Sequence, residues 1–210
     1  MPFRRFYSLV VGSSIALVPL LLLAQFPKRH AWPLFVAKSP EDPALISRIQ
    51  ALSPSVSLDD AKKVAYCAVT TGQELARLWN VKGLATMMPG IQNWLVKRGA
   101  RQGGYCFQYS TEVLRRLEAL ELKTVEFHWA ETNPGTIAEN NAIVVTAIGQ
   151  PFEQGVLLDS WRSQPNLTWT QVRLDPEYHQ WKENKAYAAF VLQTPFQSRR
   201  IRRAVPVSRR

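Results

Sequence analysis

Cys106 is the residue whose sequence surroundings best suit a nucleophile. It follows the pair Gly103 and Gly104, and from residue 106 to 120 the apolar residues recur at helical spacing on one face. Cys106 is therefore predicted in the first turn of an amphipathic helix. Unpaired backbone N–H groups and the helix dipole there favour a thiolate and can hold an oxyanion. The alternative interpretation is a small core residue, because free cysteine is often buried.

A nucleophilic cysteine needs a proton acceptor, and the chain contains three histidines, His30, His128 and His179. His30 lies beside an N-terminal apolar segment, and His179 lies in a polar region that we expect to be a loop or a short helix. His128 is the better candidate for an alternative base. However, it lies on a predicted strand, in a hairpin that turns at residues 134–135, which would pair it with an inner position of the next strand.

The two cysteines, Cys67 and Cys106, are too few for a disulfide framework and lack the spacing of a zinc site. A bridge between them would be possible in an exported protein, but Cys67 is predicted inside a helix and bridge geometry is restrictive. No glycine-rich phosphate loop follows any predicted strand. We therefore expect neither a metal nor a cofactor.

The elements that would position Cys106 change type at about residue 120. Before it, helical periodicity predicts a short helix after residue 40, a longer one from residue 57 to 80, and a less regular segment up to the glycine pair. After it, short runs rich in β-branched and aromatic residues predict strands at 124–130, 142–148, 155–158, 167–172 and 187–193. This order predicts an α+β domain, with the helical N-terminal half packed on an antiparallel sheet.

Two short stretches follow Cys106: residues 139–145, Glu-Asn-Asn-Ala-Ile-Val-Val, and residues 156–161, Val-Leu-Leu-Asp-Ser-Trp. Together with a cysteine at a helix start, they make the segment from about residue 100 to 162 resemble the transglutaminase-like branch of the papain-fold cysteine hydrolases. The first stretch resembles the strand of this family that begins with the catalytic histidine, and the second resembles the following strand, which carries the catalytic acid. The resemblance implies that Cys106 is the nucleophile, that Asn140 stands at the histidine position and that Asp159 is the acid.

Asn140 departs from the family pattern in a way that affects the chemistry. An amide cannot accept a proton at neutral pH, so Asn140 could orient a thiol but could not act as its general base. The resemblance therefore favours a pseudoenzyme that binds a peptide or protein in the Cys106 cleft. The alternative is an active cysteine amidase or peptidase in which Cys106 attacks a peptide or isopeptide bond. Asp159 would orient a catalytic partner, or it would simply bind the Asn140 amide or cap the turn at residues 160–162.

The net charge of +10 is confined to the two ends of the chain. Residues 1–30 carry four basic residues and residues 199–210 carry six, with no acid in either segment, so the remainder is neutral. A neutral folded part gives no reason to expect nucleic acid as a partner. The C-terminal arginines would suit an anionic surface or an acidic partner, or form a plain solvated tail.

Residues 8–26 form an apolar run with basic residues on both sides, which predicts a hydrophobic helix acting as a signal anchor or a signal peptide. We expect a signal segment at 1–30, a proline-rich linker at 31–43, the transglutaminase-like α+β domain at 44–197 and a basic tail at 198–210. A retained anchor implies a membrane-anchored domain exported to the bacterial periplasm or cell surface. Cleavage would give a secreted protein.

Overall fold

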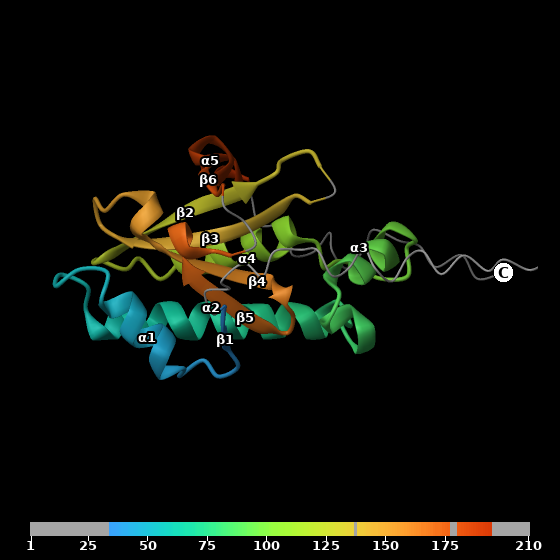
Figure 1. Cartoon of the computed structure of the whole chain (residues 1–210), viewed down its shortest axis with the longest axis horizontal. Coiled ribbons are helices and arrows are strands. Elements are labelled where there is room, and N and C mark those ends of the chain that lie inside the picture. Colours follow the sequence, from blue (N-terminus) through green and yellow to red (C-terminus); the bar gives the residue numbers. More distant parts are fainter. Residues whose placement is uncertain (1–33, 137, 177–179, 195–210) are drawn as a thin grey trace, which may run out of the picture. The chain divides into compact units, whose positions relative to one another are not determined.

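The computed structural model describes residues 34–136, 138–176 and 180–194, which fold as helices packed on a six-stranded antiparallel sheet (Figure 1). This arrangement confirms the predicted α+β class, in which helices pack on an antiparallel sheet. The predicted signal segment at 1–30 and the basic tail at 198–210 lie outside the described residues. Within the described ranges, no helix has both the length and the apolar character to cross a membrane.

The first half of the described chain is mainly helical, as predicted. Asp42 caps α1 by accepting from the Leu45 N–H, and Ser57 caps α2 by accepting from the Asp60 N–H. α4 begins at Cys106, which confirms the predicted first-turn position. The helices are α1 (Pro43–Gln50), α2 (Leu58–Leu78), the 3₁₀ helix η2 (Gly83–Thr86), α3 (Pro89–Lys97) and α4 (Cys106–Glu118).

The second half supplies most of the sheet, whose strand order is β1-β5-β4-β3-β2-β6 with every pair antiparallel. The four predicted strands between residues 124 and 172 are present. β3 is central and buried along its whole length. The strands are β1 (Phe35–Ala37), β2 (Val125–Thr132), β3 (Asn140–Ala147), β4 (Val156–Ser163), β5 (Asn166–Gln171) and β6 (Lys182–Glu183); single 3₁₀ turns, η3 (Phe152–Gln154) and η4 (Val172–Leu174), flank β4 and β5.

Two predicted segments differ from the structure. Residues 187–193, predicted as a strand, belong to the helix α5 (Lys185–Gln193), which Asn184 caps by accepting from the Tyr187 N–H. The side chain of Arg115 on α4 donates to the carbonyls of Val191 and Thr194 at the end of α5. These contacts outweigh the β propensity of the aromatic and branched residues in the segment.

The predicted linker at 31–43 contains the edge strand β1. Phe35 pairs with Trp169 of β5 in the register, and their rings stack with centroids 4.5 Å apart. A three-residue strand carries almost no periodicity, so only the pairing with β5 defines it.

The two faces of the sheet are covered differently. α1, α2 and α4 pack on one face and bury the main apolar core with Ile143, Val145 and Leu158 (Figure 1). The opposite face carries a smaller apolar cluster that includes Val144 and Leu157. Consecutive side chains of a strand point to opposite faces of the sheet. Of two adjacent strand residues, one therefore faces the side that α4 covers and the other faces the opposite side.

Asp60 joins the start of α2 to the start of β2. Its Oδ2 accepts from the hydroxyl of Thr124 (2.6 Å) and from the backbone N–H groups of Thr124 (3.1 Å) and Lys123 (3.3 Å). We expect Asp60→Ala to lower the free energy of unfolding by roughly 1–3 kcal/mol, because it leaves these donors without their acceptor. Urea denaturation followed by circular dichroism measures the change.

Asp59→Ala is the matched control, because Asp59 lies in the same helical turn and interacts with the helix dipole in the same way. Its side chain is 71% exposed and pairs only with Lys63 at the surface. Such pairs contribute less than about 1 kcal/mol. Equal destabilisation by the two substitutions would show that the link to Thr124 does not stabilise the fold.

Candidate functional site

The loop before Cys106 is held by hydrogen bonds that set the start of α4. The Gln108 Oε1 accepts from the backbone N–H groups of Gly104 (2.8 Å) and Tyr105 (3.0 Å), which is the half of a capping box that the residue at N3 supplies. Gly104 has a φ of +128° and lies against the side chain of Gln92, so a side chain at this position would be strained and would clash. The second glycine of the pair therefore lets α4 begin at Cys106.

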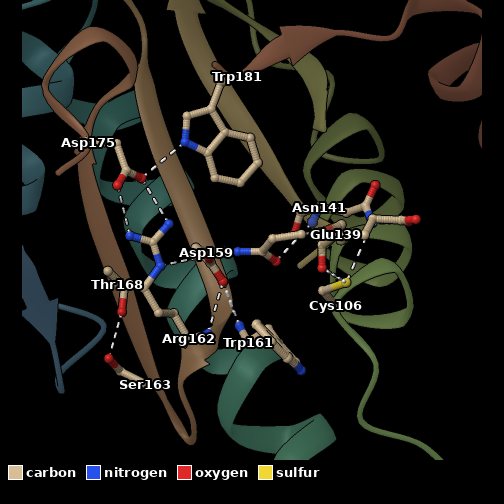
Figure 2. Close-up of polar contacts among 12 residues, drawn as sticks. Cys106, Glu139, Asn141, Asp159, Trp161, Arg162, Ser163, Thr168, Asp175 and Trp181 are labelled. Atoms are coloured by element: carbon tan, nitrogen blue, oxygen red, sulfur yellow. Dashed lines mark hydrogen bonds and ion pairs between the residues drawn. The ribbon is translucent and has the colours of Figure 1, made fainter. Parts of the chain in front are cut away.

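The Cys106 thiol is buried between α4 and the start of β3. Its Sγ lies 3.5 Å from the Asn141 Nδ2, which donates to it, and the thiol donates to the backbone carbonyl of Glu139 at 3.8 Å. Figure 2 shows the Asn141 amide beside the sulfur. Cys106 is 6% exposed, so only a small part of the residue meets solvent.

The contacts of Asn141 fix which end of its amide faces the sulfur. The indole N–H of Trp129 can only donate, and it lies 3.1 Å from the Asn141 Oδ1. The amide nitrogen therefore turns the other way, where it donates to Sγ and to the Glu139 Oε1 at 3.0 Å. In this orientation Asn141 presents a donor to the thiol and no acceptor.

Asn140, the residue that the resemblance placed at the histidine position, has other partners. Its Nδ2 donates to the Asp159 Oδ2 at 2.7 Å, and its Oδ1 accepts from the backbone N–H of Asn141. Successive side chains of a strand point to opposite faces, so Asn140 and Asn141 cannot both face α4. The amide bonded to the thiol is that of Asn141, and we correct the expected neighbour of Cys106 accordingly.

Asp159 lies fully buried on the face of the sheet that α4 does not cover. Besides Asn140, its carboxylate accepts from the backbone N–H groups of Trp161 (2.9 Å) and Arg162 (3.0 Å) and from the Arg162 Nε (3.2 Å). The two contacts expected for a structural Asp159, the amide and the turn, are both present. Arg162 continues to Asp175 through two hydrogen bonds, and Trp181 also donates to Asp175 (Figure 2).

His128 does not meet Cys106 in the structure. It pairs with Val144 in the register, which confirms the expected position inside the sheet. Its Nδ1 lies 2.7 Å from the Glu183 Oε1 and its Nε2 lies 2.8 Å from the Thr146 hydroxyl. Both ring nitrogens therefore have hydrogen-bond partners, and the ring lies on the face of the sheet away from α4. His30 and His179 lie outside the described residues.

Burial raises the pKa of the Cys106 thiol above its ordinary value. Hydrogen bonds from Asn141 and from the backbone N–H of Phe107 lower this pKa, while the charge of Asp159 raises it, and burial is the largest of these effects. We expected the helix start to favour a thiolate, but desolvation outweighs the donors of the first turn. The site therefore holds a protonated thiol at neutral pH.

Cys67 and Cys106 are both free, and Cys67 is half-buried on α2. The described part of the chain has no group of three His, Cys, Asp or Glu side chains that could hold a metal ion. No protein-family model, curated protein or solved structure matches this chain.

The sequence analysis missed the residues that surround the thiol, which are Asn141, Glu139 and Trp129. β3 is buried on both faces, so its hydrophobic pattern does not indicate which residues face α4. The available signal was the register with β2, which pairs Trp129 with Ile143 and places the indole near Asn141.

The raised pKa predicts the pH dependence of Cys106 alkylation. An unfolded thiol ionises near pH 8.5, whereas the folded thiol should stay protonated above that value. We expect slow reaction of Cys106 with iodoacetamide up to about pH 9 and faster reaction in urea, measured by mass spectrometry of the Cys106 peptide. The unfolded chain loses its proton first, so this group's contribution to stability falls as pH rises above about 8.5. Rapid native alkylation between pH 5 and 7 would contradict the assignment.

Proposed function

We propose that this protein is a degenerate transglutaminase-like domain that binds a peptide or protein ligand instead of hydrolysing it. The observation that carries the proposal is the contact between the Asn141 Nδ2 and the Cys106 Sγ at 3.5 Å. A cysteine hydrolase needs a proton acceptor next to the thiol, and here an amide donor occupies that place. The buried, protonated thiol agrees with a site that has lost its chemistry.

The order of elements supports the proposed relationship. A cysteine begins α4, a polar pair begins β3, and the neighbouring strand β4 carries a buried aspartate. Because Asn141 faces the thiol, the proposal assigns the position of the catalytic histidine to Asn141, one residue later than the resemblance implied. Asp159 then lies beyond Asn140, where it holds the turn and Arg162.

The alternative, an active cysteine amidase or peptidase, needs a base that reaches the sulfur. Among residues 34–136, 138–176 and 180–194, the side chain that bonds to the sulfur is an amide. The nearby Glu139 carboxylate is engaged by the Asn141 amide through Oε1 and by the Gly135 N–H through Oε2 at 2.7 Å. These contacts favour the binding module over the hydrolase.

We place the ligand beside Phe107, the residue that follows Cys106. Its side chain is 41% exposed and its ring stacks on that of Tyr105, with centroids 5.7 Å apart. Exposed stacked aromatic rings offer a rigid apolar contact of the kind that dominates peptide and protein interfaces. The surface formed by Tyr105 and Phe107 is therefore the proposed contact for a peptide-like ligand.

The cellular location forms part of the same proposal. The apolar run at residues 8–26 suits an anchor that holds the domain on the outer side of a bacterial membrane, or a signal peptide that releases it. The arginines of the tail suit an anionic surface or an acidic partner. Both segments lie outside the described residues.

Restoring a base at the position that faces the thiol tests the lost chemistry. We expect Asn141→His to make Cys106 react with iodoacetamide at lower pH, with a rate at pH 7 at least about tenfold above that of the wild type. The reason is that an imidazole can take the thiol proton, and general-base assistance contributes on the order of 10²–10⁴. The rate is read from the Cys106 peptide by mass spectrometry, and circular dichroism verifies the fold.

Asn140→His is the matched control, because it makes the same change one residue earlier on the opposite face of the sheet. We expect it to leave the alkylation profile of Cys106 unchanged. A gain in Asn140→His but not in Asn141→His would refute the assigned correspondence. A wild-type thiol that already reacts fast at pH 7, and loses this reactivity in His128→Ala, would instead support the active hydrolase.

Peptides selected from a random heptapeptide phage library against the full-length protein in detergent test the binding role. We expect Phe107→Ala to weaken the selected peptides by at least about tenfold, because truncation of a central aromatic contact typically has an effect above 1.4 kcal/mol. Tyr66→Ala is the control, since Tyr66 is an exposed aromatic residue in the middle of α2. Fluorescence anisotropy measures the affinities. Failure to select any peptide, or equal losses in both variants, would count against the proposed surface.

A further inference from the structure

η2, α3 and the two residues between them carry several exposed apolar side chains. Leu84 is 66% exposed, Met87 78%, Met88 59% and Trp94 54%. An open groove lies beside two of these side chains and is lined by Met88, Pro89, Gly90, Ile91 and Trp94. Exposed apolar residues gathered in this way mark an interaction surface, whereas isolated ones need no explanation. We call these four side chains the α3 patch.

The segment that carries the α3 patch is rich in basic residues and contains no acidic ones. Residues 75–111 contain five basic residues and no Asp or Glu. Lys82 precedes η2, Lys97 and Arg98 end α3, and Arg101 follows; none of these four forms an ion pair with a described carboxylate. The Arg98 guanidinium lies 5.1 Å from the centre of the Trp94 ring.

We infer that the α3 patch docks the domain onto the surface of an anionic lipid bilayer. Methionine, leucine and tryptophan side chains enter the boundary between head groups and acyl chains, where tryptophan is enriched. The four cations meet the anionic head groups, and each contributes roughly a fivefold factor in affinity. The combination of an apolar centre, an aromatic residue and cations without acids fits this occupant.

The same charges disfavour other occupants. A symmetric dimer through the α3 patch would bring the cations of two copies together, and like charges across an interface repel. An acidic peptide would satisfy the cations, and it remains an outcome that the experiment distinguishes.

The α3 patch is rigidly connected to the segment that leads to Cys106. The Gln92 Nε2 donates to the carbonyls of Trp79 (3.2 Å) and Gly103 (2.8 Å), and the Tyr105 hydroxyl donates to the Asn93 carbonyl (3.3 Å). A docked α3 therefore holds the entrance of α4 close to the bilayer. This inference does not depend on what the thiol site does.

The test uses the full chain in vesicles, with a reporter that senses only its own surroundings. Met87→Cys is labelled with bimane in a Cys67→Ser, Cys106→Ser background, and quenching by brominated phosphatidylcholine is measured. We expect strong quenching in vesicles with 30% phosphatidylglycerol and several-fold less in vesicles without anionic lipid. The same label at Ile148→Cys, another apolar position that is mostly exposed (62%) and follows β3 directly, should stay unquenched in both.

The second measurement removes positive charge next to the α3 patch, with no substitution in the apolar core. Lys97→Gln with Arg98→Gln should weaken docking roughly twentyfold, seen as loss of quenching at position 87. Lys62→Gln with Lys63→Gln removes the same charge from α2 and should have little effect. Equal quenching at positions 87 and 148, no quenching at 87, or quenching independent of lipid charge would overturn the inference. The inference would also be overturned if the fluorescence of the label at position 87 changed only with protein concentration, or only when an acidic peptide was added.

Discussion

The contact between α4 and the start of β3 is the constraint on which the site depends. Asn141 lies at this contact and connects a thiol, an indole and a carboxylate through one amide. Its hydrogen bonds to Trp129 and Cys106 are buried and the one to Glu139 is partly buried, so an unsatisfied polar group here would be destabilising. The Ser110 hydroxyl on α4 adds a bond to the Asn141 carbonyl at 2.8 Å. The helix that carries Cys106 is thus fixed to the strand by polar bonds as well as by apolar packing.

The opposite face of the sheet is organised by charge instead. Asp159, Arg162 and Asp175 form a chain of hydrogen bonds that Asn140 and Trp181 extend at its two ends. A buried ion pair gives little net stability, yet removal of one partner leaves an uncompensated charge and is strongly destabilising. Asp159 therefore has a structural role independent of catalysis. The sheet separates this network from the thiol, although the charge of Asp159 still influences the pKa of Cys106.

Under the proposed function, this geometry accounts for a hydrolase-like arrangement that persists without its chemistry. An amide at position 141 keeps a hydrogen bond to the sulfur and satisfies its neighbours, so the packing around the thiol does not need a histidine. The helix start at Cys106 still presents backbone donors, but burial keeps the thiol protonated. In the binding module that we propose, the site would keep its shape and polarity for contact with a ligand. In the sequence, the α3 patch precedes the loop that leads to Cys106, and the proposed contact at Phe107 follows it.

The sequence by itself determined the local elements and the class of the fold. The glycine pair and the helical spacing placed the start of α4 at Cys106, and four strands followed from their β-branched and aromatic residues. It failed for α5, where an apolar run with β propensity is helical because of the Asn184 cap and the bonds from Arg115. It also missed β1, which exists only through its pairing with β5. The tertiary structure alone decided which of two adjacent asparagines faces the thiol. The physical reason is that β3 is buried on both faces, so one residue of register changes the partner of Cys106 without changing the hydrophobic pattern.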